Sequence, residues 1–262
     1  MNNKPIGVID SGIGGLSVLT HLIADMKHES FIYFADSAFC PYGQKKYDEI
    51  RQRLKKIVDF LIKTHDTKTI VVACNTATAA AIDFLRENYT IPFIGMEPAI
   101  KPAALSTKNN TIGVLATEGT FNGRLFKTTC QKFANNIKIN VQAGNGLVEL
   151  IEKGQIDGTE IETLLYKYIT PMVHENADLI VLGCTHFPFL IQTINKLFPQ
   201  LKLIDPAPAV SKQTFNIIKQ NNILGNTKQK ETIFYTSGIT SRLNAFLLKN
   251  MNIKSESIHI TI

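Results

Sequence analysis

The alternation of apolar and polar positions along the chain predicts short buried strands separated by amphipathic helices. Residues 6–9, 70–72 and 179–182 are apolar runs with the composition of strands that are buried on both faces. Between such runs, apolar side chains recur at helical spacing, as at positions 50, 54, 57, 58, 61 and 62. Strands that alternate with helices in this way are typical of an α/β fold with parallel sheets.

The same pattern extends over the whole chain. Further strands are predicted at 31–36, 91–95, 111–116, 137–141, 201–205 and 232–236. Helices are predicted at 16–26, 44–64, 76–85, 121–133, 159–175, 211–220 and near 243–248. One more helix is expected directly after Cys184, extending to Phe198.

Two parts of the chain carry the same order of features. The strand at 6–9 recurs at 112–115, 106 residues later, with glycine second in both. Cys74 and Cys184 each follow an apolar strand and lie 110 residues apart, and the Pro-Ala segments at 98–99 and 208–209 keep that offset. We therefore predict two similar three-layer α/β domains related by a pseudo-two-fold axis, with the active site in the cleft between them.

The segment after residue 210 contains two predicted helices and one predicted strand, too little to form a domain of its own. We assign this segment to the first half of the chain. The predicted domains are then 1–97 plus 208–262, and 98–207, with the two Pro-Ala segments as the connections.

The two repeated cysteines fall where this class of fold binds ligands. Each lies in the turn at the carboxyl end of a predicted strand, the edge at which open α/β sheets form their binding sites. A helix that starts directly after each cysteine would point its free N–H groups at the turn and favour a thiolate. The pseudo-symmetry would place Cys74 and Cys184 on opposite walls of one cleft.

Two thiols on opposite sides of one carbon suit the inversion of a stereocentre. One thiolate removes a proton, and the other thiol returns a proton from the opposite face. Asp10, at the end of the first strand, is placed to assist Cys74, whereas Glu152 and His186 are placed to assist Cys184. Donors that suit the carboxylate and ammonium groups of an amino acid adjoin these positions: Ser11, Asn75, Thr76 and Thr185.

Simpler interpretations of the same residues stay open. A lone buried cysteine is usually a small hydrophobic residue, and Asp10 can act as a helix cap. The run Cys184-Thr185-His186 can be half of a metal site, but we find nothing in the sequence that completes one and expect no metal. A disulfide between the two cysteines is disfavoured by the reducing compartment that we expect.

The turn at 11–15 contains three glycines and resembles a dinucleotide-binding motif. It has Ser17 at the last position of that motif, however, and it lacks the Gly-Lys-Ser/Thr of a P-loop. We interpret the glycines instead as positions where backbone N–H groups can approach a small anion such as a carboxylate.

Composition narrows the class of protein. Of the 262 residues, 44% are hydrophobic and 19% are charged, and the net charge of +6 is spread along the chain, which suits small anionic ligands and not nucleic acid. No apolar run approaches the roughly 20 residues of a membrane span, and we recognise no signal peptide. The four cysteines have no CxxC spacing, so we expect reduced thiols in the cytoplasm.

Four motifs carry a family resemblance. They begin at Val8 (Val-Ile-Asp-Ser-Gly-Ile-Gly-Gly), Cys40 (Cys-Pro-Tyr-Gly), Ala73 (Ala-Cys-Asn-Thr-Ala) and Gly183 (Gly-Cys-Thr-His-Phe-Pro). With these motifs the chain resembles, over nearly its whole length, the glutamate racemase family of cofactor-independent amino-acid racemases. Such enzymes supply D-glutamate for bacterial peptidoglycan.

The resemblance implies that Cys74 and Cys184 are the two acid/base catalysts, and that Glu152 is an auxiliary carboxylate beside His186. It implies glutamate as the small-molecule substrate, no cofactor and a homodimer. It also implies a substrate site formed by Asp10, Ser11, Tyr42, Gly43, Asn75, Thr76, Thr117, Thr120, Thr185 and His186. Two alternatives stay open: a racemase of the same family that acts on aspartate, and a non-catalytic protein that binds a small anion.

Overall fold

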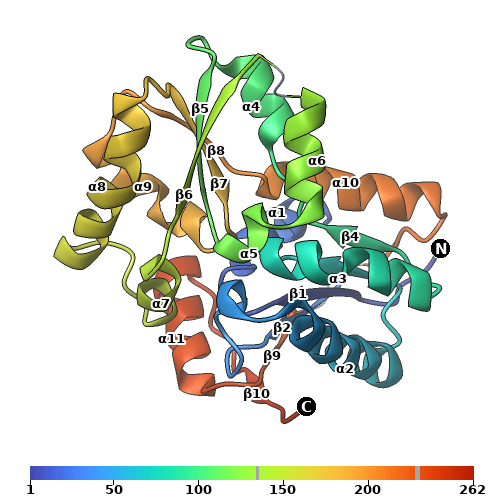
Figure 1. Ribbon diagram of the computed structural model, residues 1–262. Coiled ribbons are helices and arrows are strands. Elements are labelled where there is room, and N and C mark those ends of the chain that lie inside the picture. Colours follow the sequence, from blue (N-terminus) through green and yellow to red (C-terminus); the bar gives the residue numbers. More distant parts are fainter. Residues whose placement is uncertain (134–135, 228–230) are drawn as a thin grey trace.

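Two parallel sheets, one in each lobe of Figure 1, form the frame of the molecule. The computed structural model describes residues 1–133, 136–227 and 231–262. In spatial order, the larger sheet contains β10 (Ile258–His259), β9 (Ile233–Thr236), β2 (Phe31–Ala35), β1 (Ile6–Asp10), β3 (Thr69–Val72) and β4 (Phe93–Gly95). The smaller sheet contains, in spatial order, β6 (Lys138–Ala143), β5 (Thr111–Ala116), β7 (Leu179–Gly183) and β8 (Lys202–Ile204).

The two sheets repeat one arrangement of strands. The order β2-β1-β3-β4 in the larger sheet matches β6-β5-β7-β8 in the smaller sheet. The register matches as well, because Gly7 of β1 pairs with Ile70 of β3, and Gly113 of β5 pairs with Ile180 of β7. The predicted internal repeat and the two-part α/β fold are therefore confirmed. Because β3 and β7 occupy equivalent positions in their sheets, Cys74 and Cys184 lie just beyond equivalent strand ends.

Helices cover the sheets and connect their strands. The larger sheet is accompanied by α1 (Leu16–Asp25), α2 (Tyr47–His65), α3 (Asn75–Asn88), α10 (Ala207–Gln220) and α11 (Thr240–Met251). The lobe of the smaller sheet contains α4 (Ile100–Ser106), α5 (Glu118–Phe121), α6 (Arg124–Phe133), α7 (Leu147–Glu152), α8 (Thr159–His174) and α9 (Ile191–Leu197). The described residues also form two short 3₁₀ turns: η1 (Tyr42–Gln44) lies between β2 and α2, and η2 (Phe187–Leu190) lies between β7 and α9. Among the described helices, none is long and apolar enough to cross a membrane.

The apolar runs of the sequence become the buried strands and helix faces. Every position of β1, β2 and β3 is buried, as the apolar runs within them predict. On α2 the buried side chains recur at helical spacing and pack against α3 and the sheet. Most polar side chains of α2 stay in solvent, so the helix is held by one apolar stripe together with the buried Arg53.

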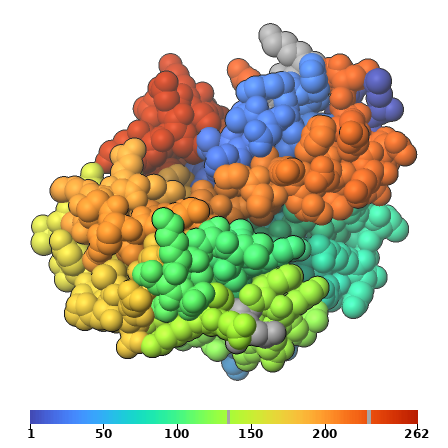
Figure 2. Space-filling view, turned by 90° about the horizontal axis from the view of Figure 1, so that it is seen from above, coloured from blue at the N-terminus to red at the C-terminus, as the bar shows by residue number. Residues whose placement is uncertain are grey.

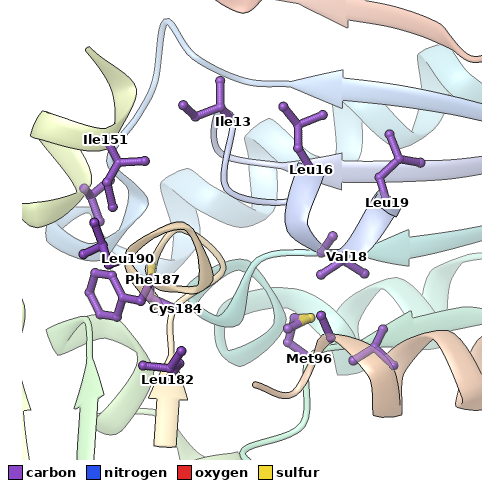
Figure 3. Packing of buried hydrophobic residues seen from close by; sticks show 14 of the residues in the cluster. Ile13, Leu16, Val18, Leu19, Met96, Ile151, Leu182, Cys184, Phe187 and Leu190 are labelled. Carbon is purple, nitrogen blue, oxygen red and sulfur yellow. The ribbon is translucent and has the colours of Figure 1, made fainter. Parts of the chain in front are cut away.

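One hydrophobic cluster joins the two lobes. Leu16 and Leu19 of α1 belong to the same cluster as Leu182 of β7 and Ile151 of α7. Figure 3 shows Ile151, Leu182, Phe187 and Leu190 around the loop that carries Cys184, and Leu16 and Leu19 farther away on α1. Because this apolar contact lies beside the strand ends, it fixes how the two sheet edges face each other.

The chain passes between the lobes after β4 and after β8. The helices that begin just beyond these passages are α4 and α10, and Figure 2 shows the orange surface of α10 and the green segment that contains α4 on the same face. From there α10 packs against α1, which supports the assignment of the C-terminal segment to the first domain. The exact division into 1–97 plus 208–262 and 98–207 stays a prediction.

Several elements differ from the prediction. The helix expected at 121–133 begins only at Arg124, as α6, and α4, α5 and β10 were not predicted. The second Pro-Ala segment is the first turn of α10 and not a linker, because proline is tolerated at that position of a helix. The helix expected directly after Cys184 is the largest departure, since η2 precedes α9 there.

Candidate active site

Cys74 and Cys184 line one cavity between the two lobes. Cys74 is the N-cap residue of α3, shortly after β3, and Cys184 directly follows β7. Both side chains are buried and both are free thiols. The other walls come from both lobes: Ser11, Pro41, Tyr42, Gly43, Asn75, Thr76, Thr117, Val148, Thr185 and His186. The structure thus brings the two predicted acid/base residues together with most of the predicted substrate site.

Three predicted site residues do not line this cavity but hydrogen-bond a residue that does. Asp10 accepts from Thr185, Glu152 contacts His186, and Thr120 lies within hydrogen-bond distance of Thr117. The cavity itself has a volume of only about 10 Å³, which is about the space of one water molecule. An amino acid therefore enters only when the walls of the cavity move apart.

The environment of Cys74 combines opposing influences. The Ala77 N–H at the start of α3 donates to the sulfur at 3.5 Å, and the thiol lies 3.8 Å from the Ser11 hydroxyl oxygen. Burial nevertheless raises the pKa of Cys74, and the nearby Asp10 carboxylate raises it further. The expectation that the helix N-terminus makes this thiol a thiolate is therefore wrong for the substrate-free protein, because desolvation outweighs the helix.

Cys184 has a different environment. No α-helix starts behind it, since η2 begins at Phe187 and contains Pro188, which has no N–H to donate. The sulfur instead lies 3.7 Å from Nδ1 of His186. The predicted symmetry of the two thiols thus holds for their strand ends but not for the groups that surround them.

His186 is held between Cys184 and Glu152. Its Nε2 lies 2.6 Å from Oε1 of Glu152, and the same oxygen accepts the Ile13 N–H at 2.8 Å. Burial lowers the pKa of His186, but hydrogen bonds to Cys184, Cys40 and Glu152 act in the opposite direction and leave the pKa well above its usual value. The raised pKa favours the protonated imidazole on this side of the cavity.

The glycine-rich turn after β1 packs directly against Glu152 and His186. A Cβ atom at Gly12 would lie 1.9 Å from Oε1 of Glu152, and one at Gly14 would lie 2.4 Å from Nδ1 of His186. Only glycine allows such close approach at these two positions. The turn does hold a carboxylate on a backbone N–H, as the glycines indicate, but the carboxylate is the protein's own Glu152.

Asp10 links the two lobes beneath the cavity. Its Oδ1 accepts the Gly12 N–H at 2.7 Å, and its Oδ2 accepts the Thr185 hydroxyl from the other lobe at 3.0 Å. Burial raises the pKa of Asp10 even though His186 and these hydrogen bonds act to lower it. A buried carboxyl group with a raised pKa beside a reactive thiol is a candidate for proton exchange.

Polar groups that can bind a substrate gather at the start of α3. The Thr76 hydroxyl oxygen lies 2.7 Å from that of Thr117, which in turn lies 2.9 Å from that of Thr120, so this cluster also crosses between the lobes. Within the described part of the chain, the buried Oδ1 of Asn75 has no hydrogen-bond partner. A buried unpaired amide oxygen is costly, and a ligand in the adjoining cavity would satisfy it.

Tyr42, in the wall of the cavity, is held in place by two residues that the sequence analysis did not single out. Its hydroxyl donates to Oδ2 of Asp36 at 2.6 Å, and Arg53 holds the same carboxylate in a buried ion pair of 2.7 Å. The tyrosine hydroxyl is therefore engaged away from a substrate, and the turn at 42–43 is held rigidly. Asp36 follows β2 as Asp10 ends β1, and this likeness is the signal that could have revealed it.

Cys40 completes a cluster that the sequence analysis missed. Cys40, Glu152 and His186 each offer one ligand atom, and these atoms lie within 4.8 Å of one another. Burial raises the pKa of Cys40 to about 12, against the effect of a hydrogen bond with His186. Of the half metal site noted in the sequence, His186 therefore has two potential co-ligands from distant segments, whereas Cys184 is not part of this cluster.

A larger hollow lies on the other side of Glu152, between α7 and α11. Its volume is about 430 Å³, and its lining includes Lys153, Arg242 and Lys249. Neither Cys74 nor Cys184 borders it. The two thiols therefore line the small cavity and not this hollow.

Comparison with known proteins gives one consistent result. The family model for Asp/Glu/hydantoin racemases matches residues 6–214. A glutamate racemase of Herpetosiphon aurantiacus is 42% identical over 240 residues, which cover 91% of this chain and 94% of that protein.

Two solved structures have the same fold over essentially their whole length. A glutamate racemase isoform of Bacillus anthracis, RacE1, has a TM-score of 0.91 at 29% identity and covers 100% of this chain and 99% of its own. The glutamate racemase of Francisella tularensis, solved in complex with D-glutamate, has a TM-score of 0.84 at 33% identity and covers 100% of this chain and 98% of its own.

Proposed function

Because the chain belongs to the Asp/Glu/hydantoin racemase family, we propose that it interconverts L- and D-glutamate by a two-thiol mechanism. The observation that carries the proposal is the placement of Cys74 and Cys184, two buried free thiols from different lobes, on the walls of one cavity. The glutamate racemases that are 42% and 33% identical to this chain match it over nearly their full length, which supports glutamate as the substrate.

The reaction inverts the α-carbon in two proton transfers. One cysteine, as the thiolate, removes the α-proton from one face of the amino acid and becomes a thiol. The other cysteine, which starts as a thiol, donates its proton to the opposite face and becomes a thiolate. The reverse reaction exchanges these roles, and two acid/base groups suffice without a bound cofactor.

On the Cys74 side, the bound substrate itself would favour the thiolate that the reaction needs. Burial and Asp10 disfavour a free thiolate at Cys74. A bound ammonium group next to the sulfur would offset both effects, because an opposite charge favours the ionised form. Asp10, held by Gly12 and Thr185, is placed to accept or return the proton as the charge shifts.

On the Cys184 side, His186 and Glu152 would act together. Nδ1 of His186 lies 3.7 Å from the sulfur, and Nε2 lies 2.6 Å from Oε1 of Glu152. A protonated imidazole in this position stabilises the Cys184 thiolate when it forms and restores its proton afterwards. The carboxylate fixes the orientation of the ring, as in other histidine–carboxylate pairs.

Substrate binding is assigned to the donors around the cavity. We assign the substrate's polar groups to Ser11, Asn75, Thr76, Thr117, Thr120, Thr185, His186 and the turn at Tyr42 and Gly43, with Asp10 behind them. The unpaired amide oxygen of Asn75 supports an ammonium or other donor at that point. The small volume of the cavity supports a cycle in which the lobes open for the substrate and close around it.

Circular dichroism of the purified protein with each enantiomer of glutamate and of aspartate tests this function. We expect the signals of L- and D-glutamate to converge on zero without any added cofactor. Convergence with aspartate alone would keep the two-thiol reaction and assign it to the shorter substrate. No change with either amino acid would overturn the proposal.

A catalytically silent binding protein would share the fold but not the reactive thiols. We therefore expect iodoacetamide to alkylate Cys74 and Cys184 in the opened protein and glutamate to protect both. Alkylation of one cysteine alone, or without protection by glutamate, would favour the binding protein.

The cellular setting follows from the proposed reaction. We propose a cytoplasmic homodimer that supplies D-glutamate for peptidoglycan, in line with the reduced thiols and the family. Light scattering on a size-exclusion column, which gives the mass in solution, tests the dimer. A mass of 29.1 kDa, that of one chain, at working concentrations would exclude it.

A further inference from the structure

We propose that Cys40, Glu152 and His186 form an inhibitory binding site for a thiophilic divalent cation such as Zn²⁺. The three residues come from the loop before η1, the end of α7 and the turn after β7. In the described part of the chain, they are the one group of three or more potential ligands whose donor atoms all lie within 4.8 Å. This inference goes beyond the racemisation proposed above, in which Cys40 takes no part.

The donor set suits zinc. Zn²⁺ binds thiolate sulfur at about 2.3 Å and imidazole nitrogen or carboxylate oxygen at about 2.1 Å, so ligand atoms around one ion lie about 3.5 Å apart. The present separations, within 4.8 Å, need only side-chain adjustments to reach that value. One sulfur, one nitrogen and one oxygen fill three tetrahedral positions and leave the fourth for water.

The charges also balance. On binding, the Cys40 thiol loses its proton to solvent, and the metal replaces the proton that His186 shares with Glu152. A thiolate and a carboxylate then neutralise the two positive charges of the ion, which keeps the buried site neutral as a whole. The Ile13 N–H, which already donates to Glu152, would keep the carboxylate oriented toward the metal.

The position of the site explains why it would inhibit. Nε2 of His186 faces Glu152, whereas Nδ1 faces Cys184 at 3.7 Å. A metal between Nε2 and Glu152 would leave the cavity lining and the Nδ1 proton in place, but it would replace the Nε2 proton, so His186 could no longer become an imidazolium or exchange a proton with Glu152 while it assists Cys184. We therefore expect the metal to lower kcat more than it raises KM for glutamate.

A cation can reach this cluster from solvent, because Cys40 and Glu152 are only partly buried. Lys153, Arg242 and Lys249 around the neighbouring hollow oppose a cation that approaches from that side. Binding is therefore measured after incubation to equilibrium, and higher ionic strength is expected to speed its onset.

Cobalt substitution tests the site without reference to activity. Co²⁺ bound to a thiolate gives a charge-transfer absorption band in the near ultraviolet. We expect the wild type to bind one Co²⁺ with this band, and Cys74→Ser and the matched control Cys130→Ser to retain it. Cys40→Ser should lose the band. Glu152→Gln should keep the band, with an affinity for Co²⁺ that falls by about tenfold at most.

Zinc inhibition provides the second measurement. Each protein is compared with its own metal-free rate, and EDTA should restore that rate. We expect Cys40→Ser to need at least about tenfold more free Zn²⁺ for half inhibition than the wild type or Cys130→Ser.

Two results would overturn the proposal. The first is the absence of a thiolate band in the wild type. The second is a band that survives Cys40→Ser but is lost in Cys74→Ser, which would place the metal on the acid/base thiols. Because the cobalt measurement needs no turnover, its outcome is independent of whether glutamate is the substrate.

Discussion

Nε2 of His186 lies 2.6 Å from Oε1 of Glu152, so the turn after β7 and the end of α7 meet directly behind Cys184. The other ring nitrogen, Nδ1, lies 3.7 Å from the Cys184 sulfur. The imidazole thus faces a carboxylate with one ring nitrogen and a thiol with the other. Cys74 has no such partner and relies on the start of α3 and on Asp10.

Replacement of Glu152 by Gln should weaken the coupling between Glu152 and His186. The neutral amide removes one of the hydrogen bonds that raise the pKa of His186, so that pKa should fall, as ¹⁵N NMR of the histidine ring can measure. Racemisation should fall by about 10²-fold, at the lower end for loss of acid/base assistance. An unchanged His186 titration would contradict the proposed coupling.

The same variant has a consequence for stability. A histidine with a raised pKa stabilises the fold below about pH 6.5, its unfolded value, and this stabilisation is lost as the pH rises through the raised folded value. In Glu152→Gln this stabilisation should be smaller, and its loss should be complete at a lower pH. Thermal unfolding measured over a pH series checks the direction.

The two cysteines should each be indispensable in both directions. Cys74→Ser and Cys184→Ser should lower kcat for L- and D-glutamate by about 10²- to 10⁴-fold, because one proton transfer loses its acid/base group. The matched control is Cys130→Ser, which removes a half-buried thiol on α6. Turnover near the wild-type rate in either of the first two variants would refute the mechanism.

Asp10→Asn should separate activity from stability. Burial raises the pKa of Asp10, so the folded protein gains nothing from its ionised form. The stability that the protonated carboxyl contributes is complete below about pH 3.9 and is lost as the pH rises through the folded pKa. At neutral pH the variant should therefore unfold at the same or a higher temperature, while racemisation falls by about 10²-fold or more.

Calorimetry and initial rates measured on the same preparation test this pair of outcomes. A variant that is both less stable and fully active would contradict the account. Low activity with a lowered unfolding temperature would point to loss of the hydrogen bonds from Gly12 and Thr185 instead.

Gly12→Ala should act through Glu152. The added methyl group would occupy the position of the carboxylate, 1.9 Å from its oxygen, so Glu152 must move away from His186. We expect activity to fall to the level of Glu152→Gln and stability to fall by about 1–3 kcal/mol from overpacking. In a double-mutant cycle the two changes should be strongly non-additive in activity. Additive losses would show that Gly12 has a separate role.

The hydroxyl cluster that joins the lobes should affect binding more than chemistry. Thr117→Val removes a hydroxyl group that lies 2.7 Å from that of Thr76, and we expect KM to rise about fivefold, the effect of one hydrogen bond. Thr128→Val is a matched control, because that exposed hydroxyl only donates to the backbone of α6. A fall in kcat alone would contradict a role in binding.

The sequence predicted the sheets and the positions of the two thiols because both depend on local signals. Apolar runs marked β1, β3, β5 and β7, and the offset between Cys74 and Cys184 revealed the repeat. The strand order in the two sheets agrees with that repeat.

Other features could not be read from the sequence because they depend on distant contacts. The meeting of Cys40 with Glu152 and His186 arises from the packing of three separate turns. The raised pKa of Cys74 arises from burial between lobes, which no local pattern measures. The loss of an α-helix behind Cys184 had a local signal in Pro188, but the repeat suggested a copy of the first half instead.

The central claim is that two facing thiols exchange the α-proton through solvent-derived protons, and NMR in D₂O tests it most directly. Purified protein is given L-glutamate, and the α-proton is followed early in the reaction. The two-thiol mechanism predicts that D-glutamate forms with deuterium at the α-carbon while the remaining L-glutamate keeps its proton. D-glutamate that retains the original proton, or L-glutamate that exchanges without inversion, would contradict the mechanism.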